Sequence, residues 1–252
     1  MSGKVYLVGA GPGDPELLTL KAVACIRKAD LILYDYLIDD RALLYAKAGA
    51  ELVPLDDSSG ESQVEQTEIN RRMIDGAMAG QTVVRLKGGD PHIFGKLNDE
   101  IKALSFEAGI EFEIVPGITS AFAAAQAAGI SLTDRHYTDS WALAFISGLR
   151  SRDPSLPKPD FKQFSTFPGT LVFYMGMCSA EVWSRELLDG GKSVETPVLF
   201  VCNATLPNQR VVRTTLGKVK EAVGAVNTES TCAGNCIVIV GQTVRINHPI
   251  DF

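Results

Sequence analysis

The stretch VVRLKGGDPHIFGK, residues 83–96, carries the clearest structural signal in the chain. Its apolar run stops at Gly88 and Gly89, and Asp90 follows at once. Glycines let a backbone adopt unusual dihedral angles or approach a ligand closely. A neighbouring carboxylate can accept hydrogen bonds from a ribose hydroxyl or an ammonium group. The stretch therefore predicts a strand that ends in a ligand-binding turn, and the alternative is a tight turn that aspartate merely caps.

Similar apolar runs precede and follow this stretch. Strands alternate with segments of helical spacing, which predicts an α/β fold with a largely parallel sheet. Ligands of such sheets bind beyond the strand ends, and Gly9, Asp35, Gly88 and Pro116 all follow predicted strands. The strands are expected at 5–8, 31–34, 51–55, 82–86 and 112–115, and the helices begin at Asp14-Pro15 and cover 64–79 and 121–128.

The second half of the chain changes character, which predicts a second domain. Segment 150–169 contains four prolines and is expected to be a long loop. We place the domains at 1–118 and 119–252, both of the α/β class. Strands are expected at 141–146, 171–175, 198–201, 209–214 and 236–240, with helices at 180–188 and 216–223.

Composition and charge exclude several classes of protein. The chain has 252 residues, of which 46% are hydrophobic, and a net charge of −6, which does not favour nucleic acid. No apolar run approaches the roughly 18 residues that cross a bilayer, and the first residues lack a secretory signal, so we expect a cytoplasmic protein that does not enter a membrane. Five scattered cysteines and isolated His92, His136 and His248 predict buried thiols and no metal site.

The loop after the first strand leaves three interpretations open. Gly9-Ala10-Gly11-Pro12-Gly13-Asp14 resembles a dinucleotide fingerprint, but Asp14 stands where that pattern needs glycine. A carboxylate there would repel phosphates at the helix N-terminus. A dinucleotide site, a purely structural turn and a site for another nucleoside-type ligand all remain possible. A third loop, Pro116-Gly117-Ile118-Thr119-Ser120, follows another strand and strengthens the case for a nucleoside site.

Taken together, these loops resemble the tetrapyrrole methylases. Six blocks match that family in order, at 8–22, 83–95, 115–121, 170–177, 197–212 and 237–244. The resemblance implies two α/β domains with the active cleft between them, usually in a homodimer. It implies that the N-terminal domain supplies the glycine-rich loops and the substrate side of the cleft, and that the C-terminal domain completes the cofactor site.

The resemblance also implies a reaction and its cofactor. The donor would be S-adenosyl-L-methionine, leaving S-adenosyl-L-homocysteine, and the acceptor uroporphyrinogen III, methylated at two pyrrole carbons to precorrin-2 for sirohaem or cobalamin synthesis. Since this cofactor has no phosphate, backbone groups and hydroxyls suit it better than an anion site. By position, the implied cofactor residues are Pro12, Gly88, Gly89, Asp90, Ile93, Thr119, Ser120, Met175 and Ala204.

The family likeness places a general base and substrate contacts as well. Asp35 stands where the base that removes a proton after methylation is assigned, and its alternative role is to cap a turn. The eight carboxylates of the substrate require cationic partners. Candidates for substrate binding are Lys96, Asp99, Arg135 and Met177, with Arg150 and Arg210 as further basic residues.

The chain departs from the family around the expected substrate. Asp56-Asp57-Ser58 replaces a Gly-Lys-Arg loop, so that Asp57 stands where a lysine proton donor is usual. Lys96-Leu97-Asn98-Asp99 replaces Arg-Gly-Gly-Glu, and Ser147-Gly148-Leu149 replaces Thr-Gly-His. Another tetrapyrrole, such as a later precorrin, or loss of turnover in a cofactor-binding relative are therefore alternatives. A nicotinamide-dependent dehydrogenase is the remaining one.

Overall fold

The computed structural model describes residues 3–35, 38–55, 64–135, 141–148, 159–226 and 235–245. The chain divides into two units, Met1–Ser120 and Ala121–Phe252. Each unit has its own sheet and its own buried core.

The first unit is built on a five-stranded sheet in the order β3-β2-β4-β1-β5, and every pairing is parallel. Because all strands run the same way, their carboxyl ends meet at one edge, where the loops after β1, β2, β4 and β5 begin. The strands are β1 Lys4–Gly9, β2 Leu31–Tyr34, β3 Glu51–Pro54, β4 Thr82–Lys87 and β5 Phe112–Val115.

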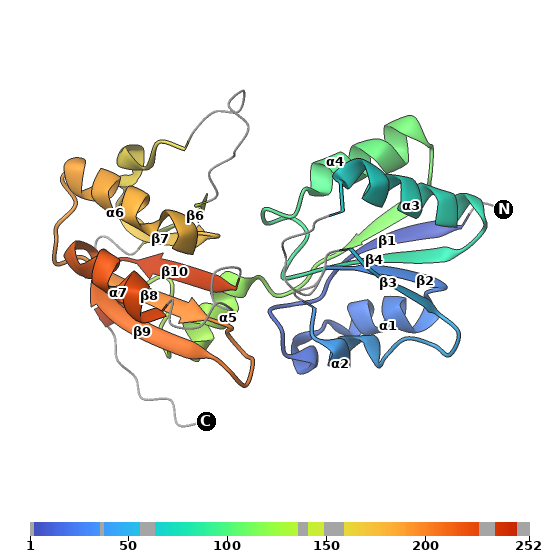
Figure 1. Cartoon of the computed structure of the whole chain (residues 1–252), viewed down its shortest axis with the longest axis horizontal. Coiled ribbons are helices and arrows are strands. Elements are labelled where there is room, and N and C mark those ends of the chain that lie inside the picture. The colour runs from blue at the N-terminus through green and yellow to red at the C-terminus, as the bar shows by residue number, and fades with distance from the viewer. Residues whose placement is uncertain are drawn as a thin grey trace. The chain divides into compact units, whose positions relative to one another are not determined.

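Helices cover both faces of this sheet (Figure 1). On one face α1 Leu20–Lys28 and α2 Asp40–Leu43 pack over a core that includes Val84 and Leu86 of β4. On the other face α3 Gln66–Met78, α4 Leu97–Ile101 and the π-helical segment η2 Lys102–Glu107 pack over Val83. The alternation of side chains along β4 thus places Val83 and Arg85 on the α3 and α4 face.

The second unit has a mixed sheet in the order β6-β7-β10-β8-β9. Only β6 and β7 are parallel, whereas β7–β10, β10–β8 and β8–β9 are antiparallel, so a largely parallel sheet describes the first unit but not this one. The strands are β6 Ala142–Ser147, β7 Gly169–Tyr174, β8 Pro197–Cys202, β9 Arg210–Thr215 and β10 Cys236–Val240.

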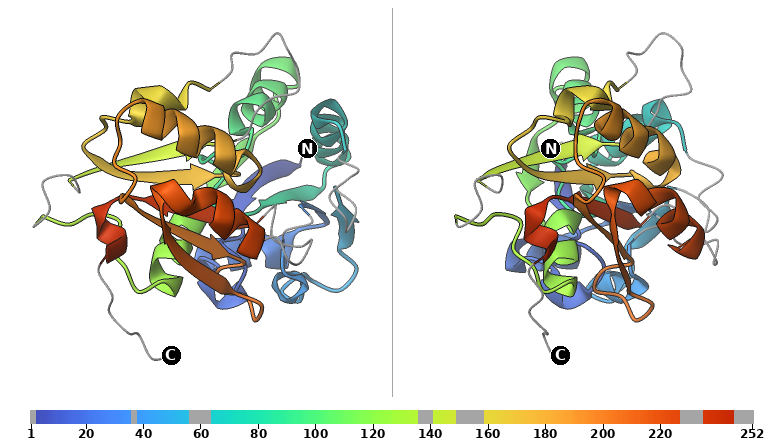
Figure 2. Two further views of the ribbon diagram at one scale, coloured as in Figure 1. Left: turned by 60° about the vertical axis from the view of Figure 1, so that its left-hand side comes forward. Right: turned by 90° about the vertical axis from the view of Figure 1, so that its left-hand side faces the viewer.

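Two helices, α6 Ala180–Asp189 and α7 Val219–Val226, lie side by side on one face of that sheet (Figure 2). Trp183 of α6 is fully buried there and stacks on Phe173 of β7, with ring centroids 4.6 Å apart. Phe122 of α5 Ser120–Ala127 contacts Phe145 of β6. Short 3-10 turns complete the unit at η3 Phe161–Phe164, η4 Met177–Ser179, η5 Leu216–Lys218 and η6 Gln242–Arg245.

Two helix predictions need correction. Asp14 does cap a helix, but only the single 3-10 turn η1 Pro15–Leu17, and α1 starts later, where Thr19 Oγ1 accepts from the Ala22 amide at 3.0 Å. The helix expected from Leu216 is η5 followed by α7. Helices α2 and α4 were not among the predicted elements.

Bare backbone lets the loops after β1, β4 and β5 touch at the carboxyl edge of the first sheet. A Cβ atom added to Gly9 would lie 2.6 Å from the Gly117 nitrogen and 2.7 Å from the Gly89 oxygen. A Cβ atom on Gly117 would overlap the Gly89 oxygen. Side chains at these two positions would therefore push the loops apart.

We predict that Gly117→Ala destabilises the first unit by about 1–3 kcal/mol, because the added methyl group overlaps backbone that cannot move independently. The matched control is Gly224→Ala in α7, where an added Cβ meets nothing within 4 Å. That control should stabilise by about 0.5–1 kcal/mol through helix propensity. Urea denaturation measures both, and a neutral Gly117→Ala would contradict the close approach.

Candidate functional site

Two loops at the carboxyl edge of the first sheet are joined through their backbones. Gly11 and Gly89 form an isolated antiparallel bridge, with N–H···O distances of 3.1 Å from Gly11 to Gly89 and 2.7 Å in return. Both glycines have positive φ, 75° and 68°, which a glycine adopts without strain. The loops after β1 and β4 are thereby held as one glycine-lined surface.

Asp90 ties the loop after β4 to the loop after β5. Its Oδ2 accepts from the Gly117 amide at 3.0 Å, and its Oδ1 accepts from the His92 amide at 2.8 Å. The His92 ring nitrogen Nδ1 also lies 2.8 Å from Oδ1. Both carboxylate oxygens thus have partners within the protein. The geometry gives Asp90 a structural role, and direct binding of the cofactor by Asp90 stays a prediction.

The other cofactor residues predicted in this unit lie on the same loops. Gly88 is exposed and donates its amide to Asp35 Oδ2 at 3.4 Å, whereas Gly89 is buried. A Cβ atom on Gly89 would lie 3.6 Å from Ser120 Oγ, so the absence of a side chain opens space beside that hydroxyl. Pro12, Ile93 and Ser120 are half-buried and Thr119 is buried.

Asp35 belongs to a chain of four charged groups that sequence patterns do not connect. Its Oδ1 accepts from Arg85 Nη2 at 2.5 Å. Arg85 Nε also donates to Glu100 Oε1 at 3.2 Å, and Lys87 Nζ donates to that same oxygen at 2.6 Å. Arg85, Lys87 and Glu100 are almost completely buried, while the side chain of Asp35 is 26% exposed.

Burial and the neighbouring charges affect the pKa of Lys87 in different directions. Burial lowers the pKa of Lys87 and so does the Arg85 guanidinium nearby, while Glu100 opposes both by attracting the lysine charge. Glu100 Oε2 is buried without a hydrogen-bond partner among the described residues. Removing one member of a buried ion pair costs about 3–5 kcal/mol, so each of these groups stabilises the others.

The sequence does contain a signal for these buried charged groups. A parallel strand covered on both faces normally reads as a continuous apolar run. Arg85 and Lys87 interrupt such a run at alternate positions and so point to the same face, where a buried acid must meet them. The sequence around Glu100 has no feature that distinguishes this buried acid from the glutamates on the surface.

The predicted substrate residues of the first unit lie at the start of α4. Lys96 is exposed and adopts φ 53°, ψ 27° at the N-cap, and Asp99 is exposed in the first turn. A non-glycine residue in the left-handed region is uncommon and often occurs at functional sites. Their contact with a substrate stays a prediction.

In the second unit, two predicted cofactor residues lie just beyond strand ends. Met175 follows β7 with φ 53°, and buried Ala204 follows β8 between Asn203 at φ 51° and Thr205 at φ 71°. Positive φ is strained for a β-branched residue such as Thr205.

The predicted substrate residues of the second unit differ in exposure. Met177 is 3% exposed inside the hydrophobic core, which favours the packing role that methionine often has. Arg135 is exposed, and its carbonyl accepts from Trp141 Nε1 at 3.2 Å. Arg210, at the start of β9, is half-buried.

Several expectations fall outside the described residues, namely those on Asp56-Asp57-Ser58, His136, Leu149, Arg150, Cys232 and His248. In the described part of the chain, Cys25, Cys202 and Cys236 are buried thiols as expected, and Cys178 is exposed. The same part contains no group of three or more His, Cys, Asp or Glu side chains that could hold a metal ion. Nor does it contain a helix long and apolar enough to span a membrane.

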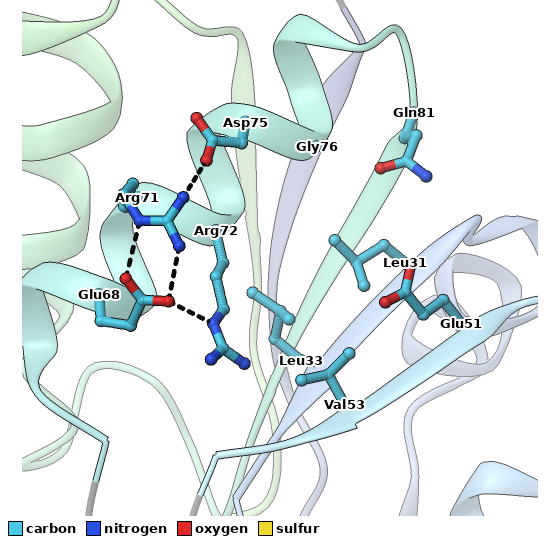
Figure 3. Close-up of a pocket in the computed structure, with 10 residues that line it drawn as sticks. All are labelled: Leu31, Leu33, Glu51, Val53, Glu68, Arg71, Arg72, Asp75, Gly76 and Gln81. Carbon is cyan, nitrogen blue, oxygen red and sulfur yellow. Dashed lines mark hydrogen bonds and ion pairs between the residues drawn. The ribbon is translucent and has the colours of Figure 1, made fainter.

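A pocket of about 450 Å³ lies between α3 and strands β2 and β3 (Figure 3). Its charged lining pairs internally, since Glu68 accepts from Arg71 at 2.7 Å and from Arg72 at 2.8 Å. Leu31 and Gln81, which also line it, lie beside the amino ends of β2 and β4, whereas Asp35 and Gly88 follow their carboxyl ends. The pocket is therefore separate from the glycine-lined surface.

Comparison with known proteins assigns the family. The model of the tetrapyrrole (corrin/porphyrin) methylases matches residues 4–220. The chain belongs to this family. It is 39% identical over 247 residues to a uroporphyrinogen-III C-methyltransferase of Methanocaldococcus jannaschii, covering 98% of each chain.

Solved structures agree with this assignment. A uroporphyrin-III C-methyl transferase of Thermus thermophilus, complexed with S-adenyl homocysteine, matches with a TM-score of 0.78 and 38% identity over 96% of this chain and 94% of that one. A cobalt precorrin-4 methyltransferase matches with a TM-score of 0.81 and 29% identity over 96% and 95%. The predicted class of two α/β units of the tetrapyrrole methylase type is confirmed. The chain spans about half the length of the siroheme synthases that it also matches.

We predict that Asp90→Asn destabilises the protein by about 1–3 kcal/mol, since an amide cannot accept from both the Gly117 amide and the His92 ring and backbone. The control Asp75→Asn alters a carboxylate that is 57% exposed and should stay within about 0.5 kcal/mol of the wild type. Urea denaturation gives both values. Equal stabilities would show that Asp90 does not join the two loops.

The ion pairs of the pocket predict a titration. Arg71 and Arg72 lower the pKa of Glu68 from its usual 4.5 to about 2. The stabilisation from these pairs is therefore complete above about pH 4.5 and is lost as pH falls through about 2. Carboxyl carbon shifts in an NMR titration should show this midpoint, and Arg71→Met should raise it toward 4.5. An unchanged midpoint in Arg71→Met would contradict the pairing.

Proposed function

We propose that this chain is an S-adenosylmethionine-dependent C-methyltransferase that methylates uroporphyrinogen III to precorrin-2. The observation that carries the proposal is the 39% identity to a uroporphyrinogen-III C-methyltransferase over 98% of both chains. A related structure that contains S-adenyl homocysteine supports the choice of cofactor. The product would enter sirohaem or cobalamin synthesis.

The chemistry of the glycine-lined surface fits this cofactor. Gly88 leaves exposed backbone, and Gly89 has no side chain beside the Ser120 hydroxyl, which suits a nucleoside and an amino-acid end. The two cations of β4, Arg85 and Lys87, are buried against Glu100 and so do not serve a phosphate. A dinucleotide would need donors for its pyrophosphate, and Asp14 caps the turn where such donors would stand.

When bound, S-adenosylmethionine supplies an electrophilic methyl group on a sulfonium centre. The task of the protein is then to position an acceptor carbon in line with that methyl group. A carboxylate close to the sulfonium would stabilise the ground state more than the transition state, in which that charge disappears. Because both oxygens of Asp90 have partners within the protein, this carboxylate is already engaged elsewhere.

Asp35 is the proposed base. Its carboxylate is partly exposed at the carboxyl end of β2, and Arg85 and the Gly88 amide fix both of its oxygens. A carboxylate held in this way can accept the proton that the macrocycle loses after a ring carbon has been methylated. Lys96, with Arg135 in the second unit, is proposed to pair with substrate carboxylates.

Other parts of the proposal rest on the family likeness. We place the division of labour at residues 1–118 and 119–252, with both parts contributing to one cleft, and we expect a homodimer in the cytoplasm. Met175 and Ala204 would complete the cofactor site from the strand ends of the second unit.

A second acceptor is supported by one observation. The cobalt precorrin-4 methyltransferase has a TM-score of 0.81, above the 0.78 of the uroporphyrin-III enzyme, although its identity is lower at 29% against 38%. Together with Leu97 and Asn98 in place of the usual glycines, this makes a later precorrin the competing substrate. The identity favours uroporphyrinogen III.

Incubation with uroporphyrinogen III and methyl-labelled S-adenosylmethionine should place two labels in each product molecule. Asp35→Asn should lower kcat by about 10²-fold or more, as loss of a general base does, while binding of S-adenosylhomocysteine stays within about twofold. Glu113→Gln, at a surface ion pair, is the control. Tight binding of S-adenosylhomocysteine without label in the ring would contradict the choice of acceptor, and a precorrin should then be tested.

A further inference from the structure

The buried charges beneath Asp35 form one connected unit. Arg85 donates from Nη2 to Asp35 Oδ1 at 2.5 Å and from Nε to Glu100 Oε1 at 3.2 Å. A single oxygen, Glu100 Oε1, also accepts from Lys87 at 2.6 Å. Arg85 gains a further anchor from the Leu86 carbonyl at 3.0 Å. Glu100 therefore fixes both cations, of which only Arg85 contacts Asp35.

The fold makes room for this unit. Arg85 and Lys87 project from β4 on the side covered by α4, and Glu100 lies in α4 with 0% exposure. Gly95 completes the arrangement, since a Cβ atom there would lie 3.2 Å from Lys87 Cε and 2.9 Å from the Pro91 carbonyl. A pair of full charges is costly to bury, and a packed apolar core would serve stability equally well.

We propose that Glu100 and Lys87 are positioning residues, which act through Arg85 to hold the carboxylate of Asp35 in place. This inference rests on the proposed function, because it assigns Asp35 the task of accepting a proton. Among the described residues, Arg85 from β4 pairs with Asp35, Lys87 from β4 interacts with it electrostatically, and Glu100 from α4 pairs with both cations. Asp90 and His92, on the loop after β4, pair with each other.

The sign of each charge gives opposite predictions for two variants. The four groups sum to zero charge when all are ionised. Glu100→Gln leaves an excess positive charge near Asp35, so the acidic limb of the pH–kcat profile should move to lower pH. Lys87→Met leaves an excess negative charge, so the limb should move to higher pH. Each shift should be roughly half a pH unit, less than the one to three units of a direct partner.

Positioning also predicts a split between kinetic constants. Glu100→Gln should lower kcat about ten- to hundredfold, because Arg85 loses its side-chain anchor and Asp35 loses its orientation. KM and the affinity for S-adenosylhomocysteine should change less than about twofold. Glu113→Gln, which removes a half-buried negative charge from β5, should shift neither the limb nor kcat.

The double variant Lys87→Met/Glu100→Gln removes one charge of each sign. The acidic limb of its pH–kcat profile should return to the wild-type position while kcat stays low. If a single variant does not fold, the double variant still tests the proposal. Shifts of equal sign in the two single variants, or a double variant with wild-type kcat, would overturn the proposal.

One readout does not need turnover. The carboxyl carbon of Asp35 can be titrated by NMR, and its midpoint should follow the same opposite shifts. If these shifts occur but uroporphyrinogen III is not methylated, the proposed acceptor fails and the positioning role stands. If the wild type methylates uroporphyrinogen III and the midpoints do not move, the positioning role fails alone.

Discussion

The first unit depends on the close approach of three loop backbones at Gly9, Gly89 and Gly117. No side chain fits between them, as the overlaps of an added Cβ show. Parallel pairing brings the carboxyl ends of β1, β4 and β5 to one edge, but only bare backbone lets their loops touch there. The Gly11–Gly89 bridge and the Asp90–Gly117 hydrogen bond then fix the contact. The candidate cofactor surface follows directly from this geometry.

Beneath that surface the protein buries charge as well as apolar side chains. The linked charges of Lys87, Glu100, Arg85 and Asp35 cost desolvation energy on burial. Packed apolar side chains would stabilise the fold equally well without that cost. By contrast, the arginines of α3 are more exposed and pair with Glu68 at its surface, where ion pairs contribute little. Because burial makes the ion pairs of Arg85 and Lys87 costly, we assign a functional role to them and not to the more exposed ion pairs of α3.

Sequence patterns predicted the strands well because a buried parallel strand has a continuous apolar run between breakers. They failed where two local signals competed: Asp14-Pro15 and Thr19 are both good caps, and only packing decides that α1 begins after Thr19. They could not give the Arg85–Asp35 pair, since the partners are fifty residues apart in sequence and meet only through β2–β4 pairing. The antiparallel pairs of the second unit likewise depend on non-local register. The glycine loops could be predicted because positive φ and close backbone approach require glycine at those positions themselves.

We propose that the glycine-lined edge of the first sheet holds the nucleoside of the methyl donor. Amide chemical-shift changes on adding S-adenosylhomocysteine to deuterated, ¹⁵N-labelled protein would locate this nucleoside residue by residue. In the first unit, large changes are expected at Gly88, Gly89 and Thr119, and none from NAD at the same concentration. Changes centred instead on Gly76 and Gln81, beside the α3 pocket, would contradict it.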